Sequence, residues 1–410
     1  MAEQPMESVD ILIAGGGMVG ASLALALRGL PWTLGLVDPR PGLDEPLPPV
    51  DGPAAFGPRV SALSLASEQF LRELGIWLQL PEDRLASYTH MQVWDAEGSG
   101  KLSFSPEQAG LKQLGHIVEN RVVEHALWQA LLDWPELVRP VAARIETVER
   151  EAHHAGHADG WRVVLNDGRT ILARLLLIAD GARSPLRAQL QWPTREWSYD
   201  QTAVVATVQH TQPHAQTARQ AFHRQGPLAF LPLALPDTSS IVWSLDTPAA
   251  DEFIGLGKSA QCRALSAGIG SVLGEVSLHS PVLHFPLHQR HAKRYVQPGA
   301  ALVGDAAHSI HPLAGQGANL GLKDAAALAA VLHDAAANNL PLEEPLILRR
   351  YQRQRQTDNL QTMLAMEGLK RLFGARHPAL HLARNLGMSG FNRSPTLMRN
   401  AIRQAAGLPV

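Results

Sequence analysis

The sequence predicts an α/β fold: a Rossmann-like nucleotide-binding domain with an inserted mainly-β domain and a C-terminal helical segment. Three observations support this prediction. An apolar strand near residues 9–14 runs directly into a glycine-rich turn and a helix, a second apolar strand ends in Asp180-Gly181, and a third ends in Gly304-Asp305. Between about residues 195 and 286 the pattern changes to short strands.

Length and composition indicate a globular protein. The 410 residues suffice for two or three domains, and 45% hydrophobic with 18% charged residues is an ordinary balance. The formal net charge of −2 gives no basic signal, so no nucleic-acid partner is expected. The single cysteine, Cys262, excludes an intramolecular disulfide and fits a reducing compartment. The uncharged apolar run at residues 11–27 has 17 residues and is too short to span a membrane, so we expect a cytoplasmic protein.

The first motif is a G-x-G-x-x-G pattern at Gly15, Gly17 and Gly20, between a predicted strand and an Ala- and Leu-rich helix. In this pattern the first glycine makes the tight turn, the second lets a phosphate approach, and the third packs the helix on the strand. The next strand ends in Asp38, 18 residues after Gly20, near the spacing of a ribose-hydroxyl acceptor. Together these features predict a dinucleotide site, with a chance glycine turn as the alternative.

Two arginines stand near predicted helix starts. Residues 39–58 hold seven prolines and form a loop, after which Arg59 precedes a helix to about residue 74. An arginine at this junction is placed to meet a pyrophosphate, although a solvated side chain is the alternative. Arg121 lies near the start of a helix that runs through residue 132. A cation near a helix N-terminus is unfavourable unless it binds an anionic ligand. Taken alone, this position does not show whether Arg121 binds such a ligand.

The third motif lies in residues 301–325. An apolar strand delivers Gly304-Asp305, a Pro/Gly loop follows, and a helix is predicted from about Asn319. An acid that leaves a strand can accept hydrogen bonds from sugar hydroxyls. Glycines such as Gly315 and Gly317 beside a helix N-terminus present N–H groups to an anionic or electron-rich ligand. We therefore expect a nucleotide cofactor here, with an ordinary strand-to-helix loop as the alternative.

The segments between the motifs are predicted to be rich in β-strands. The expected strands cover residues 142–149, 160–166, 172–178, 201–209, 218–222, 228–235 and 240–245, with a hairpin at 91–104 and a short helix near 259–269. The inserted sheet is where a substrate chamber is expected. Histidines 153, 154 and 157 lie in a polar turn without carboxylate or cysteine partners, so no metal site is expected.

The C-terminal part is predicted to be helical. Residues 346–374 form one long helix or two, which carry Tyr351, Arg355, Asp358 and Asn359. The tail at 368–410 has seven Lys or Arg and no Asp or Glu, interleaved with large apolar residues. A basic helical segment with an apolar face suits a membrane surface or a partner, and packing against the nucleotide-binding domain is an equally good interpretation.

Together and in this order, the three motifs resemble those of the FAD-dependent aromatic hydroxylases, the group A flavoprotein monooxygenases. More closely, LGHIVENRVVEHAL (114–127), GPLAFLPL (226–233) and GDAAHSIHPLAGQGANLGLKDA (304–325) resemble the ubiquinone-biosynthesis hydroxylases of the UbiH/UbiF/UbiI (VisC) type. The resemblance covers about residues 9–405. The GDAAH and HPL segments look nearer to the UbiI/UbiF versions than to UbiH.

The resemblance implies FAD as the cofactor and NAD(P)H as a transient co-substrate, which binds without a Rossmann domain of its own. It implies that Gly15, Gly17 and Gly20 hold the FAD pyrophosphate, Asp38 the adenosine ribose, and Arg59 and Arg121 the phosphates and ribityl region. Asp180, with Arg183 and Arg187 nearby, would touch both FAD and NAD(P)H, and Asp305 would bind the ribityl chain. Against the isoalloxazine would lie Pro312 and the backbone of Gly315, Gly317, Ala318, Asn319 and Leu320.

The implied reaction is hydroxylation of the aromatic ring of a polyprenylated phenol in ubiquinone biosynthesis, with O2 used through a flavin C4a-hydroperoxide in an apolar chamber. The implied partners are this phenol, O2, a ubiquinone-biosynthesis enzyme complex, and the surface of the inner membrane through residues 368–410. His308 and His311 are candidates, by position alone, for a base that deprotonates the phenol. Two alternatives stay open: a prenyl-chain reductase of the geranylgeranyl-reductase kind, and a non-catalytic FAD-fold binding protein.

The expected domain organisation is discontinuous. The FAD-binding domain is assigned to residues 1–85, 112–192 and 286–345, and the β-rich substrate domain to 86–111 and 193–285. The C-terminal helical segment is assigned to 346–410.

Overall fold

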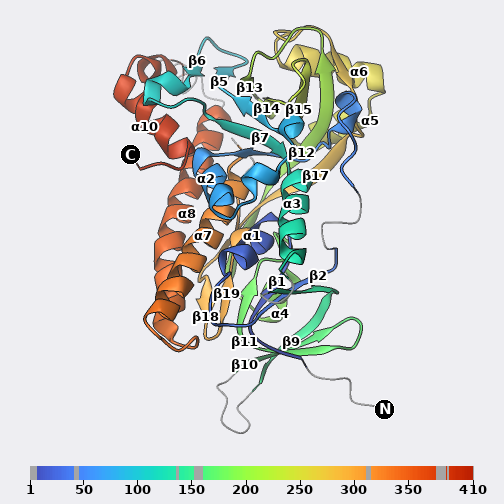
Figure 1. The fold of residues 1–410 in the computed structure, drawn as a ribbon. Coiled ribbons are helices and arrows are strands. Elements are labelled where there is room, and N and C mark those ends of the chain that lie inside the picture. Colours follow the sequence, from blue (N-terminus) through green and yellow to red (C-terminus); the bar gives the residue numbers. More distant parts are fainter. Residues whose placement is uncertain are drawn as a thin grey trace.

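The computed structural model describes residues 7–40, 46–134, 138–151, 160–310, 315–374, 385 and 387–409. Two large sheets lie one above the other in Figure 1, and the long helices α7 (Gln316–Ala337) and α8 (Pro345–Gly374) run along one side. The expected α/β class, with a parallel nucleotide-binding sheet and a second, mainly antiparallel sheet, is confirmed.

The lower sheet has eight strands. Its path is β18 (Val296–Gln297), β19 (Ala300–Leu302), β11 (Thr170–Ile178), β1 (Glu7–Ala14), β2 (Leu34–Asp38) and β8 (Val138–Ala142), with β10 (Gly160–Leu165) and β9 (Ile145–Glu151) attached to β11. From β19 to β8 the neighbouring strands pair in parallel. The central strands are nearly continuous apolar runs because both of their faces are buried. Their carboxyl ends therefore meet at one edge.

Helices α1 (Met18–Ala26) and α3 (Asn120–Leu132) pack together and, with α7, on this sheet. Close packing of α1 on α7 depends on small residues. A Cβ on Gly321 would lie 2.6 Å from a methyl of Val19, and one on Gly304 would lie 3.2 Å from the same side chain. The loop before Asp305 is thereby held directly against the glycine-rich turn.

The upper sheet has nine strands. Its path is β20 (His308–Ser309), β17 (Leu283–Ala292), β12 (Thr194–His210), β15 (Thr238–Asp246), β14 (Gly226–Pro232), β13 (Thr217–His223), β5 (His90–Asp95) and β6 (Lys101–Phe104), and β16 (Val276–Leu278) pairs with β12. One face packs against α5 (Thr247–Gly255) and α6 (Lys258–Gly268), through Val204, Trp243 and Phe253 among others. The opposite face carries Ala203 paired with Phe285, and Val205 paired with Val242.

Shorter elements connect the two sheets. A three-stranded sheet is formed by β3 (Val60–Leu63), β7 (Gly115–Glu119) and β4 (Ala86–Tyr88), with α2 (Leu65–Glu73) following β3 and α4 (Pro185–Gln189) following β11. Single 3-10 turns cover Pro53–Ala55, Trp77–Gln79, Glu82–Arg84, Pro106–Ala109 and Gly304–Ala306.

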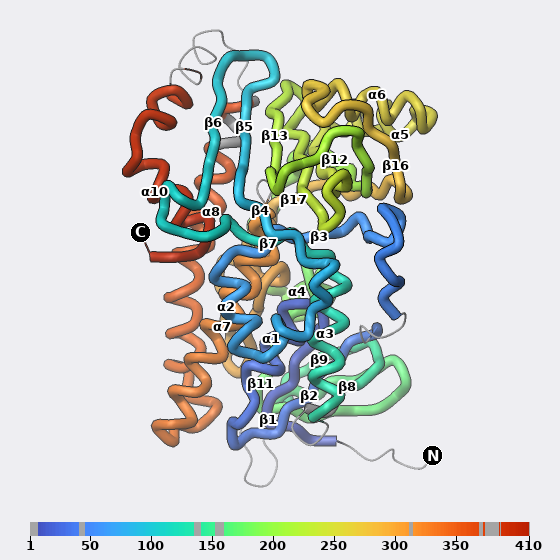
Figure 2. The backbone as a smooth tube through the Cα atoms, turned by 45° about the horizontal axis from the view of Figure 1, so that its top comes forward, coloured from blue at the N-terminus to red at the C-terminus, as the bar shows by residue number. Residues whose placement is uncertain are grey.

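The C-terminal segment packs on the upper half of the molecule (Figure 2). The apolar face of α10 (Pro395–Ala405) covers the turn Pro106–Ala109, where Ile402 contacts Ala109 and Leu114. Near the end of α8, Phe373 stacks on Phe222 of β13 with ring centroids 3.8 Å apart. The described tail thus contacts the β-rich part as well as α2, where the Ala66 N–H donates to Ala406 O.

Several elements differ from the sequence-based expectation, and strands β3 and β7 occupy residues that were expected only to lead into helices. Helix α7 begins at Gln316 rather than near Asn319, because Gly315 takes a left-handed conformation (φ 61°) directly before it. Strand β12 begins at Thr194 rather than residue 201, since pairing with β17 extends it through a polar stretch. Helix α5 was not expected; its Ala250 and Phe253 pack on the sheet. Residues 346–374 form one helix, and the hairpin at 91–104 is confirmed.

Candidate functional site

Four loops meet at the carboxyl edge of the parallel sheet. They follow β2, β1, β11 and β19, which are neighbours in that order. These strands deliver Asp38, the turn Gly15–Gly17, Asp180 and Asp305, respectively. Ligands of open α/β sheets bind at this edge. The three sequence motifs, which are separated by well over a hundred residues, therefore form one site.

The glycine-rich turn has the geometry that its pattern predicts. Gly15 has φ +103°, and a Cβ there would overlap with Ala179 O. A Cβ on Gly20 would overlap with Gly15 O. Gly17 differs, because its φ of −65° suits any residue and a Cβ would meet nothing closer than Glu124 Oε1 at 3.8 Å. The space in front of Gly17 is thus open on the side of the ligand.

Both helices that start at this edge have N-termini without side-chain caps. Gly17 precedes α1 and Gly315 precedes α7, and neither can supply a capping oxygen. No acidic residue lies in the first turn of either helix. The positive end of each helix dipole and the first-turn N–H groups, of which that of Met18 is bonded to Glu124, are therefore directed at whatever binds here, which favours an anionic or electron-rich ligand.

The carboxylate of Asp38 fixes the glycine-rich turn. Its Oδ2 accepts a hydrogen bond from the Gly16 N–H at 2.7 Å, and its Oδ1 accepts one from the Arg40 N–H at 2.7 Å. On the other side of the turn, the indole Nε1 of Trp128 donates to Gly16 O at 2.8 Å. Asp38 is only partly buried, so part of its side chain still faces solvent at the site.

Asp180 carries an unpaired oxygen. Its Oδ1 is buried without a hydrogen-bond partner among the described residues, while Oδ2 is 3.4 Å from the Leu186 N–H. Burial raises the pKa of this carboxyl group. A buried acceptor without a partner is costly, and a ligand with a hydroxyl or N–H group would satisfy it. Of the two arginines expected nearby, Arg183 is exposed.

Arg187 is buried and connects two of the loops. Its guanidinium donates to Ala306 O at 2.8 Å and to Ala182 O at 2.9 Å. Burial lowers its pKa, and the neighbouring Arg290 acts in the same direction. The structure therefore gives Arg187 a joining role between the loops of Asp180 and Asp305.

Asp305 follows β19 at the carboxyl edge of the parallel sheet, and its side chain is exposed. Solvent reaches its side chain, yet the protein that surrounds it raises its pKa, an effect that the charges of His308 and Arg59 oppose. Arg59 is exposed, and its guanidinium carbon lies 5.7 Å from the ring centre of Phe285 on β17. Arg59 thus stands between the acidic loop and the apolar face of the upper sheet.

Arg121 binds the segment that precedes β3. Its Nε donates to Glu119 Oε1 at 2.9 Å and its Nη2 to Ala55 O at 2.6 Å. Glu119 is buried, accepts from the Gly57 N–H at 2.6 Å, and forms an ion pair with the buried Arg84. The guanidinium of Arg121 is partly exposed at the rim of the site.

The start of α7 is locked to β3 and α2. The buried Asn319 accepts hydrogen bonds from the Ser64 N–H (2.9 Å) and Ser67 Oγ (2.7 Å), and it donates to Ala62 O (2.8 Å). Gly317 and Ala318 are partly buried and Leu320 is buried. His311 and Pro312 lie outside the described residues.

Replacing Asn319 by alanine is expected to lower the free energy of unfolding by about 2 kcal/mol, because buried backbone groups of residues 62 and 64 lose their partners. Urea unfolding followed by circular dichroism measures the change. The control is Asn338→Ala, an exposed amide at the other end of α7, for which less than about 0.5 kcal/mol is expected. Equal losses in the two variants would contradict this role of Asn319.

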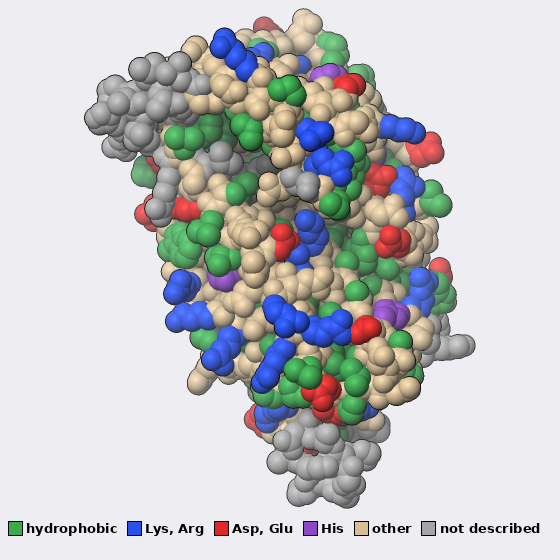
Figure 3. Space-filling model, turned by 90° about the vertical axis from the view of Figure 1, so that its left-hand side faces the viewer, with side chains coloured by type: hydrophobic (Ala, Val, Ile, Leu, Met, Phe, Trp, Pro, Cys, Tyr) green, Lys and Arg blue, Asp and Glu red, His purple; other side chains and the backbone are tan. Residues whose placement is uncertain are grey.

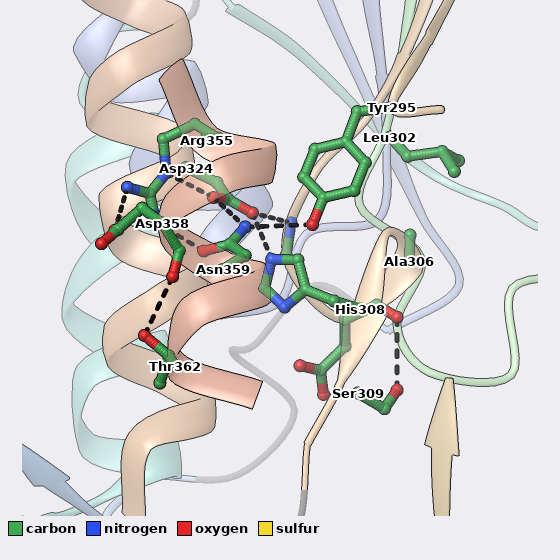
Figure 4. A network of polar contacts seen from close by, with 12 residues as sticks. Tyr295, Leu302, Ala306, His308, Ser309, Asp324, Arg355, Asp358, Asn359 and Thr362 are labelled. Atoms are coloured by element: carbon green, nitrogen blue, oxygen red, sulfur yellow. Dashed lines mark hydrogen bonds and ion pairs between the residues drawn. The ribbon is translucent and has the colours of Figure 1, made fainter. Parts of the chain in front are cut away.

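His308, expected as a candidate base, is buried on β20 and contacts Asp324 of α7 (Figure 4). Its Nε2 lies 2.6 Å from Asp324 Oδ2, while its Nδ1 is buried without a partner among the described residues. Burial raises the pKa of Asp324, but His308 and Arg355 outweigh this effect and lower it to about 2. Burial, with His308 and Arg195 nearby, lowers the pKa of the adjacent His291 to about 4.

A polar network joins this pair to α8. Asp324 Oδ1 accepts from Arg355 Nε at 2.7 Å and from Asn359 Nδ2 at 3.1 Å. Arg355 also donates to Asn359 Oδ1 at 2.7 Å and Asp358 at 2.5 Å, and Asn359 lies 3.3 Å from the hydroxyl of Tyr295. Figure 4 shows these side chains converging from α7, α8 and the strand region.

Sequence reasoning assigned no role to Asp324, Glu124 or Glu119. One signal for the network was available: Tyr351, Arg355 and Asn359 are spaced four residues apart and share one helix face. Within the part of the chain that the structure describes, no cluster of three or more potential metal ligands occurs. The histidines at 153, 154 and 157 lie outside that part.

Comparisons with a family model and with individual proteins identify the same family. A family model described as an FAD binding domain matches residues 68–357. The chain is 36% identical to 3-demethoxyubiquinol 3-hydroxylase of Escherichia coli (strain K12) over the full length of both chains. It is 34% identical to ubiquinone hydroxylase UbiL of Rhodospirillum rubrum, covering 97% of this chain and 89% of that protein. It is 33% identical to mitochondrial ubiquinone biosynthesis monooxygenase COQ6 of Danio rerio, covering 95% and 88%.

Solved structures show the same fold at low sequence identity. The p-nitrophenol 4-monooxygenase PnpA from Pseudomonas putida has a TM-score of 0.76 and 16% identity, covering 99% of this chain and 100% of that chain. PqsL from Pseudomonas aeruginosa, a probable FAD-dependent monooxygenase, has a TM-score of 0.72 and 23% identity, covering 94% and 100%.

Proposed function

This chain belongs to the family of FAD-dependent hydroxylases of ubiquinone biosynthesis, and from that premise we propose that it hydroxylates the ring of a polyprenylated phenol, using O2 and NAD(P)H. It is an FAD-dependent monooxygenase. The observation that carries the proposal is the meeting of Gly17, Asp38, Asp180 and Asp305 at one sheet edge, with Arg59 beside Phe285 of the second sheet.

The residues present fit FAD. The open space at Gly17 and the uncapped start of α1 suit a pyrophosphate, and we propose that Gly15, Gly17 and Gly20 form that cradle. The orphaned Oδ1 of Asp180 suits a hydroxyl or N–H donor of a bound nucleotide. We keep Asp38, Arg59, Arg121 and Asp305 as cofactor-binding residues, together with the α7 start.

When bound, FAD takes reducing equivalents from the nicotinamide nucleotide and activates O2, so that one oxygen atom enters the ring. The protein's part is to orient the phenol and exclude water. Ala203, Val242 and Phe285, on the face of the upper sheet away from α5 and α6, are suited to this task. His308 is buried behind the acidic loop and bonded to Asp324, so we assign it to support of that loop rather than to the base role.

Purified protein tests the function in two steps: flavin absorbance, then O2 uptake with NAD(P)H with and without a short-chain polyprenylphenol. The E. coli relative's name makes a demethoxyubiquinol-type ring the first substrate to try. Phenol-stimulated O2 uptake with a hydroxylated product supports the proposal. Bound flavin with an unchanged phenol, and a prenyl chain that becomes saturated, would favour a prenyl-chain reductase instead.

Glu124 is expected to make FAD binding dependent on pH. It lies beside Gly17, accepts a hydrogen bond from the Met18 N–H, and burial raises its pKa; Arg59, Arg40 and Asp38 are the other charges that act on it. Ionised Glu124 competes with a pyrophosphate for the start of α1. FAD affinity should therefore rise as pH falls through its raised pKa.

The variant Glu124→Gln is expected to bind FAD about three- to tenfold more tightly than wild type at about pH 8 and to lose this pH dependence. Flavin-fluorescence titration between about pH 5 and pH 8 measures the effect. Glu73→Gln, on the exposed end of α2, is the control and should behave as wild type. Weaker FAD binding by the Glu124 variant would show that the carboxylate assists the cofactor.

We propose that the protein is cytoplasmic and that the basic tail contacts the anionic surface of the inner membrane. Among the described helices none is both long and apolar enough to cross a bilayer. In Figure 3, Lys and Arg side chains also gather over the lower half of the face that includes α8, away from the tail, which packs on the upper half. The apolar face of α10 is used inside the protein, so the proposed contact depends on exposed arginines such as Arg393 and Arg399.

The double variant Arg393→Gln/Arg399→Gln is expected to bind anionic liposomes about 30-fold more weakly in sedimentation, since each basic residue near such a surface contributes about 1 kcal/mol. Arg263→Gln on the distant α6 is the control. Zwitterionic liposomes should bind neither protein. Unchanged sedimentation of the double variant would remove the support for this contact.

A further inference from the structure

Helix α8 lies next to both halves of the site. Its middle turns carry Arg355 and Asn359, which are buried behind the loop of Asp305. Its later turns carry Met366 and Phe373, which pack beside Val93 and Phe222 of the upper sheet. In Figures 1 and 2 the helix runs from the level of the parallel sheet to that of the hairpin β5–β6.

We propose that the buried network of His308, Asp324, Arg355 and Asn359 makes α8 a positioning element of the flavin site, so that FAD binding and the seating of α8 on the upper sheet are energetically coupled. The proposal rests on FAD as the cofactor and is independent of the phenol substrate.

The first link joins the acidic loop to Asp324. The same atom, Asp324 Oδ2, receives the Gly304 N–H at 3.0 Å and His308 Nε2 at 2.6 Å. These two residues stand immediately before and shortly after Asp305, so a single carboxylate oxygen fixes both ends of the turn that presents Asp305. Asp324 is fully buried, and water therefore cannot replace either contact.

The second link joins Asp324 to α8. Its other oxygen, Oδ1, receives Arg355 and Asn359, and these two side chains also bond to each other. One oxygen of Asp324 thus binds the acidic loop and the other binds α8. A shift of α8 therefore moves the carboxylate that accepts the hydrogen bonds of the loop. Such charge-assisted bonds are short and directional, which suits a positioning role.

The third link is the helix itself. Met366 and Phe373 lie about 10 Å and 21 Å along the axis from Asn359 at the usual rise per residue. Phe373 stacks on Phe222 of β13, whose strand pairs with β14 and β5 of the upper sheet. Any displacement of α8 at the network is therefore passed to the upper sheet.

Thermodynamic linkage turns this arrangement into coupling. FAD that binds only the seated acidic loop also favours the seated α8, and a seated α8 favours FAD by the same factor. In the absence of FAD the upper turns of α8 lose the stabilisation that FAD binding passes to them through the acidic loop and the network. The C-terminal turns of α8, which carry Met366 and Phe373, are then expected to separate from the upper sheet more often.

The test compares Asn359→Leu with Gln356→Leu. Gln356 lies one turn earlier on α8 and donates to Lys293 O, outside the network, which makes it a matched amide control. We expect about tenfold weaker FAD binding for the Asn359 variant by flavin-fluorescence titration, and no change for the control. Hydrogen exchange of residues 360–374 should slow on FAD addition in wild type and in the control, and much less in the Asn359 variant.

Hydrogen exchange of α6, on the far face of the upper sheet, is the control for global stabilisation. If the coupling is local, FAD addition should slow exchange in α8 more than in α6. A purely structural network would lower the melting temperature of the Asn359 variant and leave its FAD affinity and the FAD-induced protection of α8 unchanged, which would overturn the proposal. The wild-type measurement decides even if the variant fails to fold, since no FAD-dependent change in α8 exchange also overturns it.

Discussion

Replacing Gly17 by alanine is expected to leave the apoprotein folded and to weaken FAD binding by about 100-fold, or about 2.7 kcal/mol. The φ of −65° at Gly17 suits alanine, and the added Cβ would meet no described protein atom closer than 3.8 Å. The pyrophosphate, in contrast, must approach the backbone at this residue. The added methyl group therefore occupies space that the protein leaves free and the cofactor needs.

Flavin absorbance after gel filtration and a titration of the apoprotein with FAD measure the loss, and thermal unfolding of the apoprotein should be unchanged. Gly20→Ala provides the contrast, because its Cβ would overlap with Gly15 O and should reduce stability and FAD binding together. A Gly17→Ala protein that retains stoichiometric FAD would place the pyrophosphate elsewhere.

The parts of the site that sequence reasoning could predict are local ones. The turn at Gly15–Gly20, Asp180-Gly181 and Gly304-Asp305 each follow a buried apolar strand, and the carboxyl ends of parallel strands share an edge. Strand periodicity and glycine placement were therefore enough to bring these motifs together. Family membership and the fold class were likewise predicted from these motifs and confirmed.

The residues that sequence reasoning missed act through contacts between distant segments. Asp324 was hidden in an alanine-rich helix, and its meaning depends on His308 and Arg355, which arrive from β20 and α8. Glu119 was placed in the stretch that opens the helix ending at residue 132, and no role was expected for its carboxylate, which pairs with Arg84 and receives the Gly57 N–H. No spacing rule connects these positions, because each pair meets only after the sheets and helices have packed.

The roles of the predicted arginines show the same limit. Arg121 was expected at an anionic ligand and Arg187 near the Asp180 motif, and each donates to backbone carbonyls that hold neighbouring loops. A sequence shows that a cation is present near a loop, but the packed structure determines how many of its N–H groups remain free to bind a ligand. The cofactor role of Arg121 is a proposal, as are the domain boundaries; strand β17, for example, spans residues 283–292, across the expected boundary at 286.

Arg355→Met is expected to lower the free energy of unfolding by about 3–5 kcal/mol, because it leaves the buried carboxylate of Asp324 without its guanidinium partner. Asp324→Asn should be similarly destabilising, and the double variant should lose less than the sum of the two single losses, since removing both partners leaves no uncompensated charge. Arg350→Met is the control on the same helix: its partner Asp334 is exposed, and a loss below about 1 kcal/mol is expected.

The pH dependence of these variants separates the ion pair from simple packing. The pKa of Asp324 is about 2 in the folded protein, below its unfolded value of about 4, so its contribution is complete above about pH 4 and is lost as pH falls towards 2. Urea unfolding at about pH 7 and pH 3 should show wild type losing part of this contribution, whereas Asp324→Asn should lack that loss. Equal costs for Arg355→Met and Arg350→Met at neutral pH would mean that the buried network contributes no more than a surface pair, and α8 would then need another explanation for its buried charge.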